Sequence, residues 1–123
     1  MWIWKSTAGE LWHDDTFIAR GYSGFGMGQN DPALENVPNI GPIPRGSWAI
    51  GAAEYVDTVG PHGPFVLPLT AKEGTETFGR EGFLIHGDSI SHAGSASHGC
   101  IILPRQIRED IVATHDIDLE VVA

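Results

Sequence analysis

Glycine and proline interrupt this chain so often that most segments have room only for short strands and turns. Together they occupy 24 of the 123 positions, about a fifth, where a typical protein has about 12%. Glycine weakens the interior of a helix, and proline removes a backbone hydrogen-bond donor, so both residues gather in turns. The pattern therefore predicts a mainly β fold rather than a helical bundle.

The apolar and alternating runs between these interruptions predict the individual elements. One short helix is expected from Pro104 to about Thr114, because Ile107, Ile111 and Val112 recur at helical spacing. Pro68 predicts a strand at a sheet edge, since proline donates no hydrogen bond to a neighbouring strand. The expected strands are residues 2–4, 9–13, 16–22, 47–51, 65–69 and 118–122.

Irregular segments separate these elements. Residues 23–39 are rich in glycine and asparagine, and a loop of this length in a compact domain is commonly functional, so we expect it to border a cleft. Residues 41–46 should be extended up to a turn at Gly46, because the prolines there fix φ. A turn is expected at residues 61–64 and a polar loop at 71–80.

The chemically distinctive stretch is residues 83–103, which contain three of the six histidines and the only cysteine. An apolar run ends at His86, a loop of small polar residues follows, and Cys100 precedes a second apolar run. Two short strands joined by such a loop would bring His86 and Cys100 together. Nucleophiles and their bases are commonly assembled in this way from the ends of strands.

The residue types in this stretch suit nucleophilic catalysis. An unperturbed thiol has a pKa of about 8.5 and is a useful nucleophile only after it loses its proton. His86 is the better candidate base, and the carbonyl of Gly87 could orient its ring. His98 lies two residues before Cys100, and the backbone N–H groups of Gly99 and Cys100 could face a developing oxyanion.

The block Ser97-His98-Gly99-Cys100, with His86-Gly87 fourteen residues before the cysteine, resembles the signature of the L,D-transpeptidase catalytic domain. The upstream segment 44–50 is similar to the Pro-x-Gly-x-aromatic pattern with which a strand of that family begins. The resemblance implies a single L,D-transpeptidase-like β-sandwich or barrel over residues 1–123, with its short helix after the catalytic cysteine. It covers about half of the chain, from Gly41 to Leu103.

The resemblance also implies a reaction and its residues. Cys100 would attack the peptidoglycan stem tetrapeptide and remove or exchange the terminal D-alanine, with His86 as base and no cofactor. The Gly87 carbonyl would orient His86, and His98 and Gly99 would lie on the oxyanion side. Family members commonly carry arginine two residues after the cysteine, where this chain has Ile102, and Arg105 is the candidate substitute. The expected substrate-binding residues are Ser97, Tyr22, Asn30 and Arg105.

A second resemblance concerns the biological setting. The Trp-rich opening, Tyr22-Ser23-Gly24, Asn30 and the Gly-Pro-Ile-Pro-x-Gly segment from Gly41 to Gly46 are similar to the L,D-transpeptidase effectors of type VI secretion systems. Such effectors damage wall precursors in the periplasm of a target bacterium. The resemblance implies synthesis in the cytoplasm without a signal peptide, delivery by the secretion machinery, and a cognate immunity protein.

Composition limits the other partners. The net charge of −9 argues against nucleic acid, whose phosphates require a basic face. No apolar run approaches the roughly 20 residues of a membrane span. One cysteine also excludes a disulfide within the chain.

Two other functions fit parts of the same stretch. His86, His92, His98 and Cys100, with Asp88, could supply three ligands to a zinc ion in a peptidoglycan amidase or peptidase. The residue pattern contains no His-x-x-x-His or Cys-x-x-Cys pair to support such a site. A non-enzymatic domain that binds the cell wall through exposed tryptophans is the remaining alternative.

Overall fold

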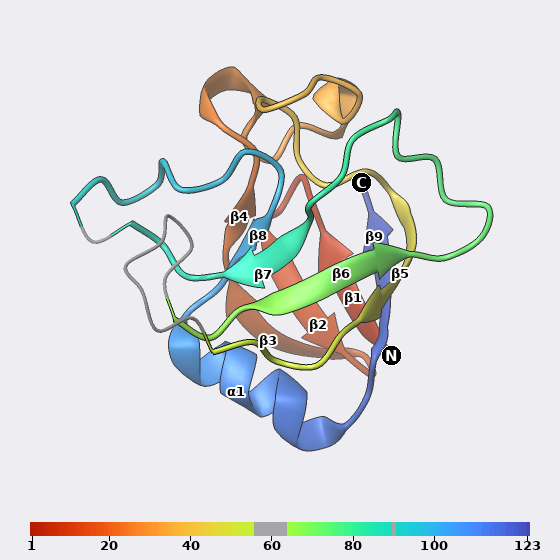
Figure 1. The fold of residues 1–123 in the computed structure, drawn as a ribbon, viewed down its shortest axis with the longest axis vertical. Helices are drawn as coiled ribbons and strands as arrows, with labels where there is room; N and C mark the ends of the chain where they lie inside the picture. The colour runs from red at the N-terminus through yellow and green to blue at the C-terminus, as the bar shows by residue number, and fades with distance from the viewer. Residues whose placement is uncertain (56–63, 90) are drawn as a thin grey trace.

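The computed structural model describes residues 1–55, 64–89 and 91–123 (Figure 1). Within these residues nine strands form a single sheet in the order β3-β2-β1-β9-β5-β6-β7-β8-β4. The expected turn at residues 61–64 lies outside the described residues, apart from Pro64. The strands are β1 (Trp2–Lys5), β2 (Glu10–His13), β3 (Thr16–Arg20), β4 (Tyr22–Ser23), β5 (Gly46–Ile50), β6 (Leu67–Ala71), β7 (Leu84–His86), β8 (Ile101–Ile102) and β9 (Asp118–Val122).

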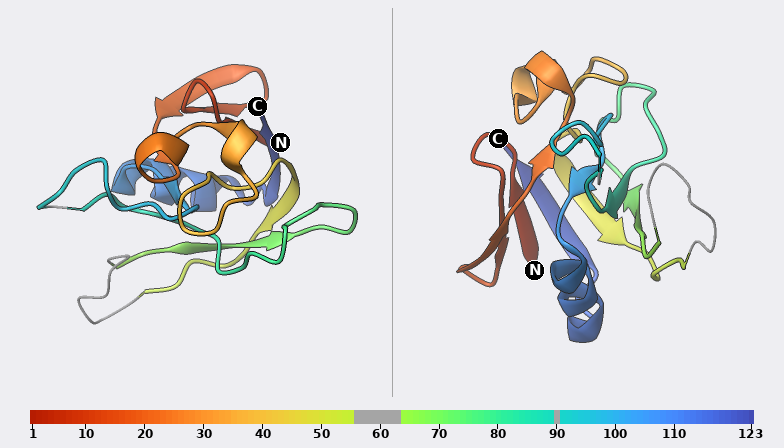
Figure 2. Two further views of the ribbon diagram at one scale, coloured as in Figure 1. Left: turned by 90° about the horizontal axis from the view of Figure 1, so that it is seen from above. Right: turned by 90° about the vertical axis from the view of Figure 1, so that its left-hand side faces the viewer.

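The sheet curls until its two edge strands almost meet. β3 and β4 lie at opposite ends of the strand order, yet only Gly21 separates them in the sequence. A Cβ atom at Gly21 would lie 2.1 Å from the carbonyl oxygen of Ile102, so the edges approach this closely only because residue 21 is glycine. The strands at the two ends of the chain and those in its middle face each other across the interior (Figure 2). The expected mainly β sandwich or barrel with one short helix is confirmed.

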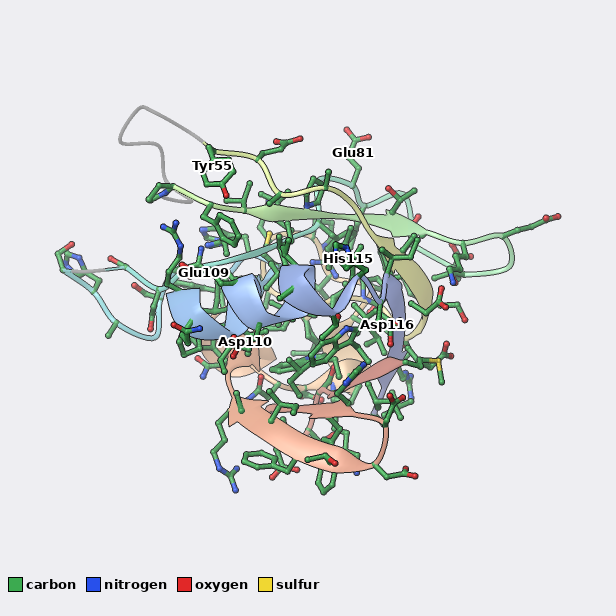
Figure 3. All side chains as sticks on the ribbon, turned by 90° about the horizontal axis from the view of Figure 1, so that it is seen from below. Tyr55, Glu81, Glu109, Asp110, His115 and Asp116 are labelled. Atoms are coloured by element: carbon green, nitrogen blue, oxygen red, sulfur yellow. The ribbon has the colours of Figure 1, made fainter. Side chains whose placement is uncertain are left out.

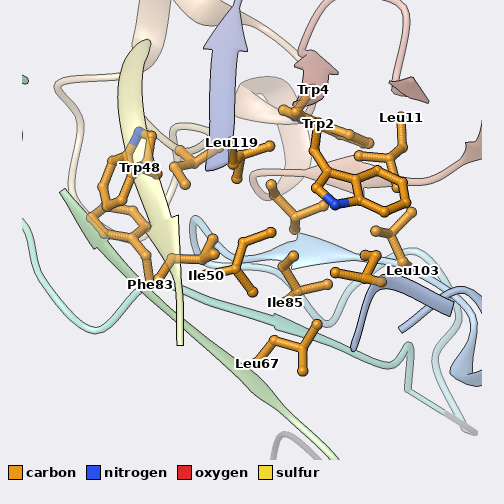
Figure 4. Close-up of a cluster of buried hydrophobic side chains, with 14 of the residues drawn as sticks. Trp2, Trp4, Leu11, Trp48, Ile50, Leu67, Phe83, Ile85, Leu103 and Leu119 are labelled. Atoms are coloured by element: carbon orange, nitrogen blue, oxygen red, sulfur yellow. The ribbon is translucent and has the colours of Figure 1, made fainter. Parts of the chain in front are cut away.

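The interior between these strands is a single apolar cluster. Alternate residues of β1, β5, β6 and β9 point inward, as the twofold repeat of an extended chain requires. Trp2, Trp4 and Trp48 are almost completely buried, and the Trp48 ring packs edge-on against Phe83 with ring centroids 5.1 Å apart. Ile85 of β7 (Figure 4) and Ile101 of β8 both belong to the same cluster, the latter by its buried contacts. The strands that carry the chemically distinctive stretch are therefore fixed by the core.

Helix α1 (Arg105–Thr114) follows β8 and packs beneath the sheet. Its Ile111 is buried in the core, and its outer face carries Glu109 and Asp110 (Figure 3). Arg108 is also buried, where its guanidinium donates hydrogen bonds to the backbone carbonyls of Leu103 and Phe65. These bonds pin the helix to the segments that flank β6 and β8. No helix among the described residues has the length and hydropathy needed to cross a membrane.

Two expectations about strands were wrong. The predicted third strand, residues 16–22, is broken at Gly21, and Tyr22 pairs with Ile102 in a separate strand. Pro68 was expected at an edge, but β6 lies between β5 and β7. The carbonyl of Pro68 accepts a hydrogen bond from the N–H of Gly51, which lies one residue past the end of β5. The missing proline donor faces this same side, beyond the last residue of β5, so the pairing of β6 with β7 loses no hydrogen bond.

Candidate active site

A cleft of about 310 Å³ opens beside the ends of β7 and β8. As expected, the long segment 23–39 borders it, through Pro38 and Asn39. Glu81 also lines it and projects outward at its rim (Figure 3). The side chains and backbone nearest the chemistry come from the loop before β7, the end of β7 and the loop before β8: Arg80, Phe83, His86, His98, Gly99 and Cys100.

His86 is the last residue of β7 and is fully buried. Its Nδ1 lies 2.8 Å from the carbonyl oxygen of Gly87. A carbonyl oxygen can only accept, so Nδ1 must carry the proton and donate it in this bond. In the neutral ring the lone pair is then on Nε2, which is the nitrogen able to take a proton.

Cys100 lies on the same side of the sheet as His86. β7 and β8 run parallel with Ile85 opposite Ile101, and both isoleucines point into the core. His86 and Cys100 are each one residue away from this pair, so both side chains point away from the core and toward the cleft. The register thus brings together two residues that are fourteen positions apart.

The Cys100 thiol is largely shielded from solvent. The residue is 8% exposed, and its Sγ lies 3.7 Å from the carbonyl oxygen of Gly82. Burial raises the pKa of the Cys100 thiol, while the backbone of Leu84 and the charge of Arg80 act in the opposite direction. The thiol is therefore protonated near neutral pH and needs a base to remove its proton when it reacts.

Two buried serines hold the segment that carries Cys100. Ser97 Oγ accepts hydrogen bonds from the N–H groups of Gly24 (2.8 Å) and Gly99 (3.1 Å) and donates one to the Cys100 carbonyl (2.5 Å). Ser23 Oγ donates to the Gly99 carbonyl at 2.9 Å. A hydroxyl has one donor and two acceptor positions, and Ser97 uses all three on the backbone. Ser97 therefore supports the nucleophile and has no hydrogen-bonding capacity left for a substrate, which corrects its expected role.

Replacing Ser97 with alanine is expected to lower the free energy of unfolding by about 3 kcal/mol, because it leaves two N–H groups and one carbonyl buried without this partner. Urea unfolding followed by tryptophan fluorescence measures the change. Ser91 is exposed in the same loop, so Ser91→Ala is the matched control and should change stability by less than about 0.5 kcal/mol. Equal stability of the two variants would show that the hydrogen bonds of the Ser97 hydroxyl do not stabilise the fold.

His98 and Gly99 occupy one wall of the cleft. His98 is exposed, its Nδ1 lies 3.1 Å from the carbonyl oxygen of Asn39, and its ring stacks on Phe25. Gly99 has a φ of +134°, which few other residues adopt. Its N–H was expected to face an oxyanion, but it is directed at Ser97 Oγ. The local hydrogen bonding therefore corrects that expectation for Gly99.

Tyr22 and Asn30 were expected to bind substrate, but they lie outside the cleft lining. The Tyr22 hydroxyl donates to Asp88 Oδ1 at 2.5 Å and accepts from the Ala96 N–H at 3.0 Å, so it ties together the loop between His86 and Cys100. Burial and the bond to Asp88 raise the pKa of Tyr22 to about 12. Asn30 Oδ1 accepts from the Ser23 N–H at 3.0 Å and stabilises the start of the long loop. Both side chains are structural supports.

Arg105 is also not brought to the cleft. It is exposed on the first turn of α1, where it pairs with Glu109 at 3.0 Å and stacks over Phe65. The positive charge that the structure does place beside Cys100 belongs to Arg80. Arg80 follows a polar loop and precedes no recognisable motif, so the sequence contained no local signal for it.

The five residues considered for zinc do not converge as a ligand set. Across residues 1–55, 64–89 and 91–123, one group of three His, Cys, Asp or Glu side chains places its ligand atoms within 4.8 Å of one another: His13, Asp14 and Asp116. The two carboxylates of that group already bind the Met1 ammonium, each at 2.7 Å. His86 and His98 each direct Nδ1 at a backbone carbonyl instead.

Comparison with known proteins agrees with the fold described above. The structure is similar to an L,D-transpeptidase from Mycobacterium smegmatis, with a TM-score of 0.53 and 18% sequence identity, over 99% of this chain and 58% of that one. At that identity the similarity establishes a shared fold, and the present chain spans little more than half of the neighbour's length. No curated protein matches the chain. The family model of the Tlde1 domain matches residues 18–122. The chain therefore belongs to the Tlde1 domain family of type VI secretion L,D-transpeptidase effectors, as its motifs predicted.

Proposed function

We propose that this protein is a cysteine L,D-carboxypeptidase and L,D-transpeptidase that removes or exchanges the terminal D-alanine of peptidoglycan stem tetrapeptides. The observation that carries the proposal is the shared cleft of Cys100 and His86, with Nδ1 of His86 held by the Gly87 carbonyl. This arrangement supplies a nucleophile, a base and a group that orients the base. Membership of the Tlde1 domain family supports peptidoglycan as the substrate.

The reaction begins with proton transfer from the Cys100 thiol to His86 Nε2 as Sγ attacks the carbonyl carbon of the third stem residue. The C=O π electrons move to the oxygen, and the backbone N–H of Cys100 is our candidate donor to that oxyanion. When the intermediate collapses, the C–N bond breaks and the imidazolium gives its proton to the departing amine of D-alanine. A thioester on Cys100 remains.

The second half of the reaction determines the product. His86 takes a proton from water or from an incoming amine, which attacks the thioester and restores the thiol. Water yields a tripeptide, whereas an amine yields a crosslink or a D-amino-acid exchange. The cleft volume of about 310 Å³ lies at the small end of ligand sites, so it suits the end of a peptide rather than a whole muropeptide.

The proposed biological role is that of an antibacterial effector. Residues 1–123 would act as one catalytic domain, made in the cytoplasm, delivered by a type VI secretion system and active in the periplasm of the target cell. A cognate immunity protein would neutralise it in the producing cell. Family membership supports this role.

Mass spectrometry of disaccharide-tetrapeptide incubated with the purified protein tests the reaction. We expect loss of terminal D-alanine that persists in EDTA and stops after iodoacetamide treatment, because the sole cysteine is the nucleophile. Adding D-methionine should yield an exchanged tetrapeptide. Cleavage that EDTA abolishes would support the zinc mechanism instead. A folded protein that turns over no muropeptide would support a binding domain.

A further inference from the structure

Arg80 connects three segments of backbone around the nucleophile. Its Nη1 donates to the carbonyls of Glu35 (2.5 Å) and Pro42 (2.8 Å), and its Nη2 donates to those of Gly41 (3.0 Å) and His98 (3.2 Å). The guanidinium also lies over the Phe83 ring, 5.1 Å from its centroid. Phe83 in turn packs on Trp48 in the core, so the arginine is fixed on both sides.

The guanidinium packs directly on the residue before Cys100. A Cβ atom at Gly99 would lie 2.5 Å from Arg80 Nη2 and 3.1 Å from Phe83 Cε1. This contact explains why residue 99 must be glycine, in addition to its φ of +134°. The position of the nucleophile segment therefore depends on Arg80.

The hydrogen-bond partners of Arg80 leave its charge available to the cleft. They are backbone carbonyls, which satisfy the donors without carrying a net charge. The nearby Glu35 carboxylate is engaged by Arg45, at 2.7 Å from Nη2 to Oε2. An arginine keeps its proton in proteins, so a fixed positive charge faces the site where a thiolate forms.

We propose that Arg80 is a positioning residue that holds the Cys100 segment against the loop at residues 35–42 and stabilises the thiolate formed during attack. The proposal rests on the proposed function, in which Cys100 is the nucleophile. The positive charge comes from the loop before β7, while the position two residues after the cysteine is the apolar Ile102. The direction in which Arg80 moves the pKa of Cys100, downward against burial, agrees with the proposal.

Alkylation of Cys100 by iodoacetamide, measured by intact mass from pH 6 to 11, tests the effect of the Arg80 charge on the thiol. The experiment requires no substrate. Replacing Arg80 with methionine should raise the apparent pKa of the thiol by about 1, because a nearby opposite charge is lost. Arg80→Lys should leave it close to wild type, since the charge remains. The other titratable groups lining the cleft are Glu81, His86 and His98; they are unchanged in these variants, so the difference reports Arg80.

Hydrogen exchange and muropeptide turnover test the positioning role of Arg80. Arg80→Lys keeps the charge but loses the planar fork that reaches four carbonyls, so hydrogen exchange should accelerate at residues 35–42 and 97–100. Muropeptide turnover should lose kcat about tenfold in both variants, with KM nearly unchanged. Arg20→Met, which removes an exposed arginine that pairs with Glu10 outside the cleft lining, is the matched control and should match wild type in thiol reactivity.

The two halves of the proposal can fail separately from the proposed function. Identical alkylation profiles for wild type and Arg80→Met would overturn the electrostatic role. Unchanged exchange in Arg80→Lys would overturn the positioning role. If wild-type protein turned over no muropeptide but the alkylation profiles still separated, the reaction assignment would fail while the effect of Arg80 on Cys100 would stand.

Discussion

Replacing Cys100 with alanine is expected to abolish release of D-alanine from tetrapeptide muropeptides, by at least about 10⁴-fold in kcat. The thioester cannot form without Sγ, and no other cysteine exists in the chain. The fold should survive, because the change removes one sulfur atom whose contact with the Gly82 carbonyl is a weak 3.7 Å interaction. Liquid chromatography with mass spectrometry measures the product, and circular dichroism measures the thermal midpoint.

Cys100→Ser is the informative companion variant. Serine keeps a nucleophilic atom of similar size, but its hydroxyl is far harder to ionise than a thiol, and burial raises the pKa even of the native Cys100. We therefore expect the serine variant to be almost as inactive as the alanine variant while unfolding at a similar temperature. Tetrapeptide cleavage that continues at the wild-type rate in Cys100→Ala would refute cysteine catalysis.

The strands and the helix were largely predictable because their signals are local. Alternating apolar and polar residues, bounded by turn-forming residues, identify β1, β2, β5 and β9. Isoleucines at helical spacing identify α1. Apolar runs on either side of the His86–Cys100 loop predicted that these two residues would meet. Parallel pairing of β7 with β8 achieves this, although each strand has only two or three residues.

The supporting groups were not predictable because their partners are distant in the sequence. Ser97 bonds to Gly24, 73 residues away, and Tyr22 bonds to Asp88, 66 residues away. The sequence motifs predicted that both residues bind substrate, yet their hydroxyls form long-range hydrogen bonds with the backbone and with other side chains. Arg80 follows the same rule, since it reaches carbonyls 38 to 45 residues earlier in the chain. Residue type alone does not reveal whether a polar group faces a ligand or the backbone.

Replacing His86 with asparagine is expected to reduce kcat about a thousandfold, within the range that general bases contribute. The asparagine amide nitrogen can still donate to the Gly87 carbonyl in place of Nδ1, so the orienting hydrogen bond is preserved. Only Nε2, the proposed proton acceptor, is removed. Steady-state muropeptide hydrolysis measures kcat, and thermal unfolding checks that the buried substitution leaves the protein folded.

His98 provides the matched control, because it lines the same cleft and also directs Nδ1 at a backbone carbonyl. His98→Asn should lose less than about tenfold in kcat if His86 is the base.

The pH dependence of turnover distinguishes the His86 variant from the His98 variant. Burial places the thiol pKa above its ordinary value, so the thiolate fraction near neutral pH is small and grows as the pH rises. Without a base, residual turnover of His86→Asn should therefore increase with pH above neutral, whereas His98→Asn should retain the wild-type profile. Equal losses with equal profiles would mean that neither histidine alone removes the thiol proton.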